Sequence, residues 1–107
     1  MSARGEFTKR PADAFVAAVD MSPWPMVAGD TVVASNARGA LGVAVADEDG
    51  ADVSATLAPD APWILDGTQV AFWLLAGEAG SRYRIVVTAP TAQGELLTAV
   101  AWLRVVA

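Results

Sequence analysis

The chain has 107 residues, enough for one domain but not for two, and its formal net charge is −5. It contains no histidine and no cysteine, which excludes Ser-His-Asp and Cys-His catalytic groups and the common zinc sites. Because an acidic surface repels a phosphate backbone, we expect no nucleic-acid binding.

The same composition bears on the compartment. A secreted domain of this size often depends on disulfides, so a chain without cysteine is expected to assemble in a reducing cytoplasm. Residues 1–10 carry charges with no apolar run behind them, and we expect no signal peptide. The longest apolar runs are too short to cross a bilayer, which predicts no contact with a membrane.

Residues 1–29 are expected to form an extended arm, because Pro11, Pro23 and Pro25 oppose regular structure. Its apolar side chains could cover an edge of the domain's own sheet or dock on a neighbouring subunit. For the part before Pro11 we favour the neighbour, because chain ends are rarely ordered without an external tie. The apolar anchors are Phe7, Phe15, Trp24 and Met26.

Residues 30–107 read as a domain of strands joined by turns. Short runs of alternating or β-branched residues are separated by Asp-Gly, Gly-rich and Pro-containing turns, which is typical of an antiparallel sandwich or barrel. A helix is the main alternative for the last run, but Thr98, Val100 and Val105 favour a strand there. The expected strands are residues 31–35, 41–46, 53–57, 63–65, 69–75, 82–88 and 96–106.

Alternation within these runs places two tryptophans. If Leu97, Leu103 and their neighbours on that face point to the core, Trp102 points outward, and by the same argument Trp73 does so in its own strand. Two outward tryptophans on one sheet would form an apolar patch typical of a protein interface. A shift of one residue would instead place either tryptophan in the core, where one tryptophan is usual in such sandwiches.

Other motifs favour turns over chemistry. The cluster Asp47-x-Asp49-Gly50-x-Asp52 offers oxygen atoms to calcium, but it lacks the rest of a calcium loop, so we expect a solvated turn and no metal. The segment 77–80 lacks the Lys-Ser/Thr ending of a phosphate loop and reads as a hairpin turn. We therefore expect no catalytic residues and no cofactor.

Short motifs in a fixed order carry a resemblance to a known family. They follow an opening segment 7–11, and they are Gly29-Asp30-Thr31-Val32, Val70-Ala71-Phe72-Trp73-Leu74, Ala76-Gly77-Glu78-Ala79-Gly80, Tyr83-Arg84-Ile85-Val86-Val87-Thr88, Thr91-Ala92-Gln93-Gly94 and Leu103-Arg104-Val105. This series resembles short proteins of tailed bacteriophages and prophages that have an immunoglobulin-like fold. The chain departs from the pattern at Ala76, where glycine is usual, and at Glu95, where arginine is common.

The resemblance implies an all-β, immunoglobulin-like antiparallel β-sandwich of about seven strands with an N-terminal arm. It implies a non-enzymatic virion structural protein that acts as an adaptor at the neck or tail, contacts other tail, neck or fibre proteins, and forms a homo-oligomer or ring. Such a protein resides in the virion after assembly in the bacterial host cytoplasm. The alternatives are a capsid decoration protein and a carbohydrate- or surface-binding module with a tryptophan platform. The candidate partner-binding residues are Phe7, Phe15, Trp24, Trp73 and Trp102.

Overall fold

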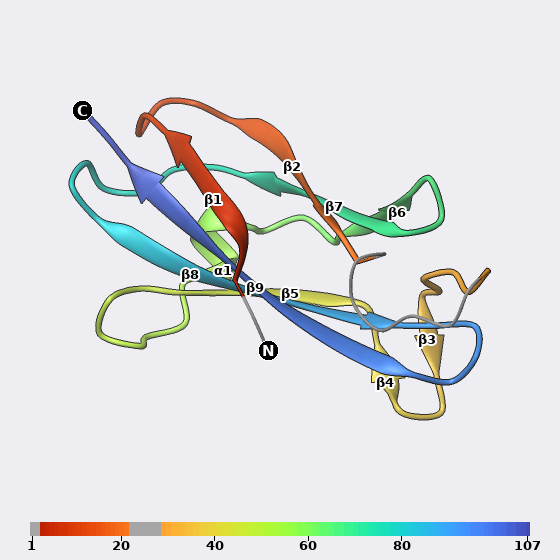
Figure 1. The fold of residues 1–107 in the computed structure, drawn as a ribbon. Helices are drawn as coiled ribbons and strands as arrows, with labels where there is room; N and C mark the ends of the chain where they lie inside the picture. The colour runs from red at the N-terminus through yellow and green to blue at the C-terminus, as the bar shows by residue number, and fades with distance from the viewer. Residues whose placement is uncertain (1–2, 22–28) are drawn as a thin grey trace.

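Two β-sheets face each other in the computed structural model, which describes residues 3–21 and 29–107 (Figure 1). The elements in chain order are β1 (Ala3–Lys9), β2 (Phe15–Asp20), β3 (Ser35–Asn36), β4 (Gly39–Ala40), β5 (Gly42–Ala46), α1 (Ser54–Leu57), β6 (Trp63–Leu65), β7 (Gln69–Leu74), β8 (Arg82–Pro90) and β9 (Leu96–Val105).

The larger sheet has the strand order β1-β9-β8-β5, and the smaller sheet has the order β2-β7-β6. Strands β3 and β4 form a separate two-stranded hairpin. Pairing between the named strands is antiparallel, except that β1 runs parallel to β9. The predicted all-β sandwich is confirmed, with this one parallel pair added to it.

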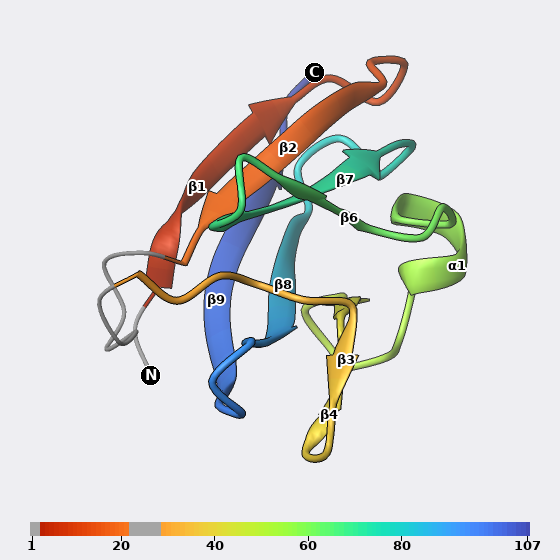
Figure 2. The same ribbon diagram turned by 90° about the vertical axis from the view of Figure 1, so that its right-hand side faces the viewer.

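The N-terminal segment differs from the extended arm expected for residues 1–29, in the part that the structure describes. Strand β1 joins the larger sheet beside β9, and β2 joins the smaller sheet beside β7. The connection between them passes from one sheet to the other, so β1 and β2 lie side by side along one edge of the sandwich (Figure 2). Pro11 falls in this connection, where it interrupts neither ladder.

The core faces follow the alternation in the sequence. On β7, Phe72 is fully buried while Trp73 is exposed, and on β9, Leu103 is fully buried while Arg104 is exposed. The predicted core faces of these strands are therefore confirmed. The buried residues on the inner faces of β7, β8 and β9 are Val70, Phe72, Leu74, Tyr83, Ile85, Val87, Ala89, Leu97, Ala99, Ala101, Leu103 and Val105.

The expected strand at residues 53–57 is wrong, because α1 (Ser54–Leu57) occupies this segment. Asp52 Oδ1 accepts hydrogen bonds from the Ser54 amide at 2.9 Å and from its hydroxyl at 2.6 Å, which favours a turn at this point. Of the α1 side chains, only that of Leu57 is buried. Because only Leu57 must reach the core, a single helical turn can place it there as readily as a strand can.

Candidate functional site

The outer face of the smaller sheet gathers exposed apolar side chains. Val16 lies opposite Trp73 on β2 and β7, and Ala71 lies opposite Trp63 on β7 and β6. Cross-strand partners project from the same side of a sheet, so these side chains share one surface with Leu65, two residues after Trp63 on β6. We call the surface formed by Val16, Trp63, Leu65 and Trp73 the apolar face.

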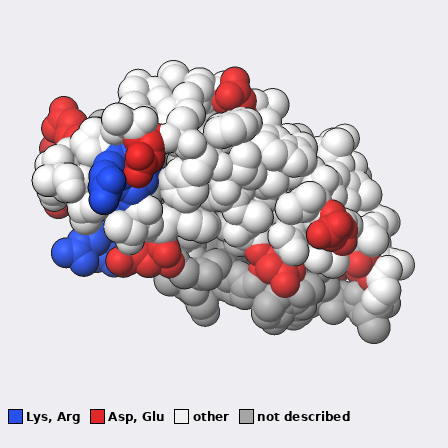
Figure 3. Space-filling view, turned by 90° about the horizontal axis from the view of Figure 1, so that it is seen from above, with Lys and Arg blue, Asp and Glu red and all other residues white. Residues whose placement is uncertain are grey.

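The apolar face concentrates exposed hydrophobic area. Val16 is 43% exposed, Trp63 37%, Leu65 39% and Trp73 38%. They are four of the five large hydrophobic side chains that are exposed among the described residues, the fifth being Leu96. Figure 3, which views the molecule from the side of the smaller sheet, shows a broad region of uncharged side chains here. Such concentration on one face is typical of a protein-interaction surface.

Trp73 and Trp102 both point away from the core, but they do not form one patch. Trp73 lies on β7 of the smaller sheet, and Trp102 lies on β9 of the larger sheet. The two indoles therefore belong to opposite outer sides of the sandwich. Trp102 is half-buried, and the guanidinium of Arg82 lies over its ring at 4.5 Å from the centroid.

The tryptophan that accompanies Trp73 is Trp63, which the sequence interpretation did not select. Its position follows from the Asp66-Gly67 turn, in which both residues have positive φ values, 53° and 76°. This turn sets Leu65 opposite Gln69, and the ladder then places Trp63 on the same face as Trp73. The Asp66-Gly67 dipeptide is visible in the sequence, and the strand register that such a turn imposes would have placed Trp63 on the same face as Trp73.

Phe7 and Phe15 cover an edge of the chain's own sandwich. Their ring centroids are 6.4 Å apart with an interplanar angle of 73°, an edge-to-face contact between β1 and β2. Both rings are partly buried against the core. The structure thus places Phe7 within its own domain, the arrangement that we did not favour from the sequence. Trp24 lies outside the described residues.

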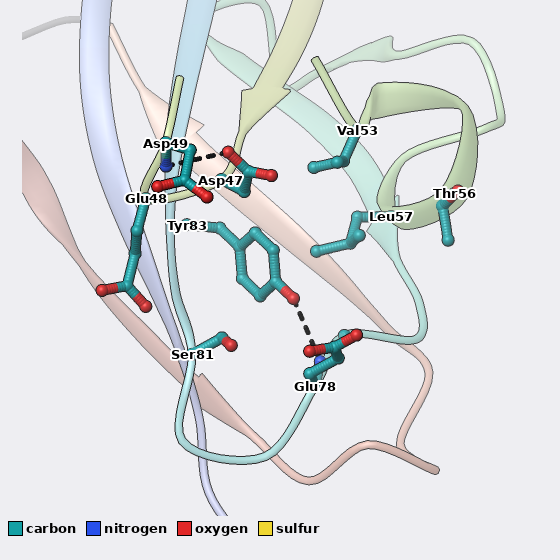
Figure 4. Close-up of a pocket in the computed structure, with 10 residues that line it drawn as sticks. Asp47, Glu48, Asp49, Val53, Thr56, Leu57, Glu78, Ser81 and Tyr83 are labelled. Carbon is teal, nitrogen blue, oxygen red and sulfur yellow. Dashed lines mark hydrogen bonds between the residues drawn. The ribbon is translucent and has the colours of Figure 1, made fainter. Parts of the chain in front are cut away.

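A pocket of about 380 Å³ opens between α1 and the start of β8 (Figure 4). The Tyr83 hydroxyl points into it and accepts a hydrogen bond from the Glu78 amide at 3.0 Å. The hydrogen-bond partner of the Tyr83 hydroxyl is therefore an amide and not a base that would activate it. The lining residues are Asp47, Glu48, Asp49, Val53, Thr56, Leu57, Gly77, Glu78, Ser81 and Tyr83.

In the acidic turn beside this pocket, residues 47–52, carboxylate oxygens accept hydrogen bonds from nearby backbone amides. Asp47 Oδ1 accepts hydrogen bonds from the amides of Asp49 and Ala51, both at 2.9 Å. The hydroxyl and amide of Ser54 bond to Asp52 and lower the pKa of its carboxyl. Within residues 3–21 and 29–107, no group of three or more acidic side chains is placed to hold a metal ion. No helix of the described residues is long and apolar enough to span a membrane.

A comparison with curated proteins found no match. A family model described as "Podophage GP4 fiber-tail adaptor protein gp77" matches residues 9–104, a span that runs from the last residue of β1 to the penultimate residue of β9. That description is of a structural adaptor and hence of a component of the virion. The match confirms the resemblance drawn from the short motifs, and the chain therefore belongs to the podophage GP4 fiber-tail adaptor protein gp77 family.

Proposed function

We propose that this protein is a non-enzymatic adaptor at the neck or tail of the virion, and that it docks on a tail or fibre protein through the apolar face. The observation that carries this proposal is the clustering of Val16, Trp63, Leu65 and Trp73 on one outer side of the sandwich. Family membership supports the class of partner.

Burial of this face is the mechanism of attachment. Each of these side chains still exposes more than a third of its surface, and covering it with a partner would contribute about 1 kcal/mol or more per residue. Tryptophan is enriched among the residues that dominate binding energy at interfaces. The three-stranded sheet offers a rigid support for both indoles, so little ordering of side chains is needed on binding.

The proposal excludes catalysis as the role of the domain. The chain has neither histidine nor cysteine, and the Tyr83 hydroxyl faces a backbone amide. The carboxylates of the acidic turn accept hydrogen bonds from the turn itself. These features support a protein that acts by binding other proteins through its surface.

The test compares two substitutions of the same kind at equally exposed leucines. Leu65→Gln lies on the apolar face at 39% exposure, and Leu96→Gln lies away from it at 38%. Particles are purified from hosts that supply either variant, and the adaptor and fibre content of the particles is quantified. We expect Leu65→Gln and Trp73→Gln each to lower incorporation or fibre attachment by about fivefold or more, because a loss of about 1 kcal/mol of apolar burial weakens binding by about that factor. Normal particles from both apolar-face variants would refute the proposal.

A carbohydrate-binding role is a second candidate, and the pair of exposed indoles on one sheet favours it. Trp63 and Trp73 offer flat rings on which sugars could stack. Titration of the protein with glycans, followed by tryptophan fluorescence, separates the two functions. A saturable change that vanishes in Trp73→Ala would favour sugar binding over the adaptor. A copy number that scales with the capsid rather than the neck would instead indicate a decoration protein.

A further inference from the structure

We propose that the outer face of β8 and β9 is a second docking surface, which binds an acidic segment of a partner protein. We call the surface formed by Arg82, Arg84, Trp102 and Arg104 the arginine face. This inference rests on the proposed adaptor function, because a protein that joins two others needs two surfaces. The arginine face lies on the larger sheet and the apolar face on the smaller one, so the two point to opposite sides.

The ladder register concentrates positive charge on the arginine face. Arg82 lies directly opposite Arg104, and Arg84 lies opposite Trp102. The three arginines are exposed. Like charges directly opposite each other destabilise a sheet, and only Arg82 of this pair has an ion-pair partner, Glu6, in the described residues. An anionic group bound between the two strands would relieve the repulsion.

The chain neutralises only part of this charge. Arg82 pairs with Glu6 at 3.5 Å, and the two side chains are 54% and 44% exposed. Arg84 and Arg104 form no ion pair with any residue of the described parts of the chain. The remaining residues, 1–2 and 22–28, contain no aspartate or glutamate. Two guanidinium groups are therefore open to carboxylates from outside.

Besides Glu6, which lies opposite Trp102 on β1, two acidic residues lie near the arginine face, and one oxygen of each accepts hydrogen bonds from the backbone. Asp47 and Glu48 share with Arg82, Arg84 and Trp102 the lining of a hollow of about 460 Å³. Glu48 Oε1 accepts a hydrogen bond from the Arg82 amide at 3.1 Å. Asp47 Oδ1 accepts two backbone hydrogen bonds within its own turn. Neither carboxylate pairs with the guanidinium groups of the face.

The composition of the whole chain makes the arginine face selective. It holds three of the seven basic residues in a chain that has twelve acidic ones. On a chain with this excess of acidic residues, unpaired guanidinium groups at one place favour docking of an acidic partner there, which sets the orientation of docking more than its strength. Arginine and tryptophan are also the residues that most often carry binding energy at interfaces.

The experiment measures binding of fluorescently labelled poly-L-glutamate to the full chain at low ionic strength. The variants are Arg84→Glu and Arg104→Glu, and the matched control is Arg10→Glu, an exposed arginine between β1 and β2 that gives the same change in net charge. We expect wild type and Arg10→Glu to bind, both face variants to bind at least about tenfold more weakly, and added salt to weaken all binding. Equal loss in Arg10→Glu, or no binding by wild type, would overturn the proposal.

Two further readouts separate the possible occupants. Tighter binding of single-stranded DNA than of poly-L-glutamate through the same arginines would identify the partner as a nucleic acid and overturn the proposal. Loss of self-association in Arg84→Glu, seen by sedimentation, with no loss of poly-L-glutamate binding would assign the surface to a second copy and also overturn it. Leu65→Gln is expected to keep full poly-L-glutamate binding, so failure of the apolar-face proposal and failure of this one are distinguishable.

Discussion

The ammonium group of Lys9 donates a hydrogen bond to the backbone carbonyl of Ala76, although 67 positions separate the two residues. It also donates to the carbonyls of Arg10 at 2.6 Å and Pro11 at 3.3 Å. The Lys9 side chain is only 3% exposed, and burial lowers its pKa while nearby Asp13 acts to raise it. Lys9 thus ties the end of β1 to the loop that follows β7.

Replacement of Lys9 by methionine should destabilise the domain by about 1–3 kcal/mol, because it removes the buried ammonium group that donates to the carbonyls of Arg10, Pro11 and Ala76 while keeping a side chain of similar length. Urea denaturation measures the loss. Arg10→Met, at the exposed neighbouring position, is the control and should change the stability by less than about 0.5 kcal/mol. Equal effects of the two substitutions would show that the Lys9 hydrogen bonds contribute nothing.

Ala76 has a φ of 55°, in the left-handed region that glycine favours. Glycine, which the resemblance led us to expect at this position, adopts such a φ without steric strain. Ala76→Gly should therefore stabilise the domain by up to about 1 kcal/mol. The substitution relieves the strain of the left-handed conformation, and the greater conformational freedom of glycine in the unfolded chain cancels part of that gain. The measurement is the midpoint of chemical denaturation.

The neighbouring Gly77 supplies the opposite case. Its φ is 97°, and a Cβ atom there would lie 2.9 Å from Cγ2 of the buried Val105. Gly77→Ala should destabilise the domain by about 2 kcal/mol or more, from backbone strain together with overpacking. A neutral Gly77→Ala variant would mean that the loop after β7 adjusts freely.

The sequence predicted what depends on local alternation and missed what depends on pairing. The inner faces of β7 and β9 follow from residues two apart, and burial of Phe72 and Leu103 agrees with them. The sequence of a single strand does not indicate which strands it will pair with. The parallel pairing of β1 with β9 joins the two ends of the chain, and no local pattern in residues 1–10 indicates it.

The same distinction holds for the candidate surfaces. The outward direction of Trp73 was predictable from its own strand, and its companion Trp63 needed the register of the Asp66-Gly67 hairpin. Arg82 and Arg84 were visible as two alternating charges, but their grouping with Arg104 required the β8–β9 register. Surfaces made from several strands therefore emerge only when the ladders are known.

Asp30 should make the stability of the domain sensitive to acid. Its carboxylate is 6% exposed, and Oδ1 accepts hydrogen bonds from the amides of Thr31 at 2.8 Å and Gln93 at 3.1 Å. Burial acts to raise the pKa of Asp30, but hydrogen bonds from the Thr91 hydroxyl and from backbone amides outweigh it and hold the pKa below its ordinary value of 3.8. The folded state therefore favours the ionised form.

Because the folded-state pKa is depressed, the contribution of Asp30 is complete above about pH 4 and is lost as the pH falls through its lower folded value. Asp30→Asn should melt below wild type at pH 7, and the difference should narrow as the pH approaches 2. Thermal melts across this range test the prediction, with the exposed Asp60→Asn as control. A difference in melting temperature that stays constant at every pH would mean that Asp30→Asn acts through altered packing or hydrogen bonding and not through loss of the carboxylate charge.

The edge-to-face contact of Phe7 with Phe15 should hold β1 and β2 together along the edge of the sandwich. Phe7→Ala should cost about 2 kcal/mol, below the range for a fully buried phenylalanine because the ring is only partly covered. A double-mutant cycle with Phe15→Ala should give a coupling energy of about 0.5–1.5 kcal/mol. Coupling near zero would show that the rings stabilise the fold independently. In that case the β1–β9 ladder and the hydrogen bond of Lys9 to Ala76 hold β1 in place, and β1 should detach from the sandwich when these hydrogen bonds are lost.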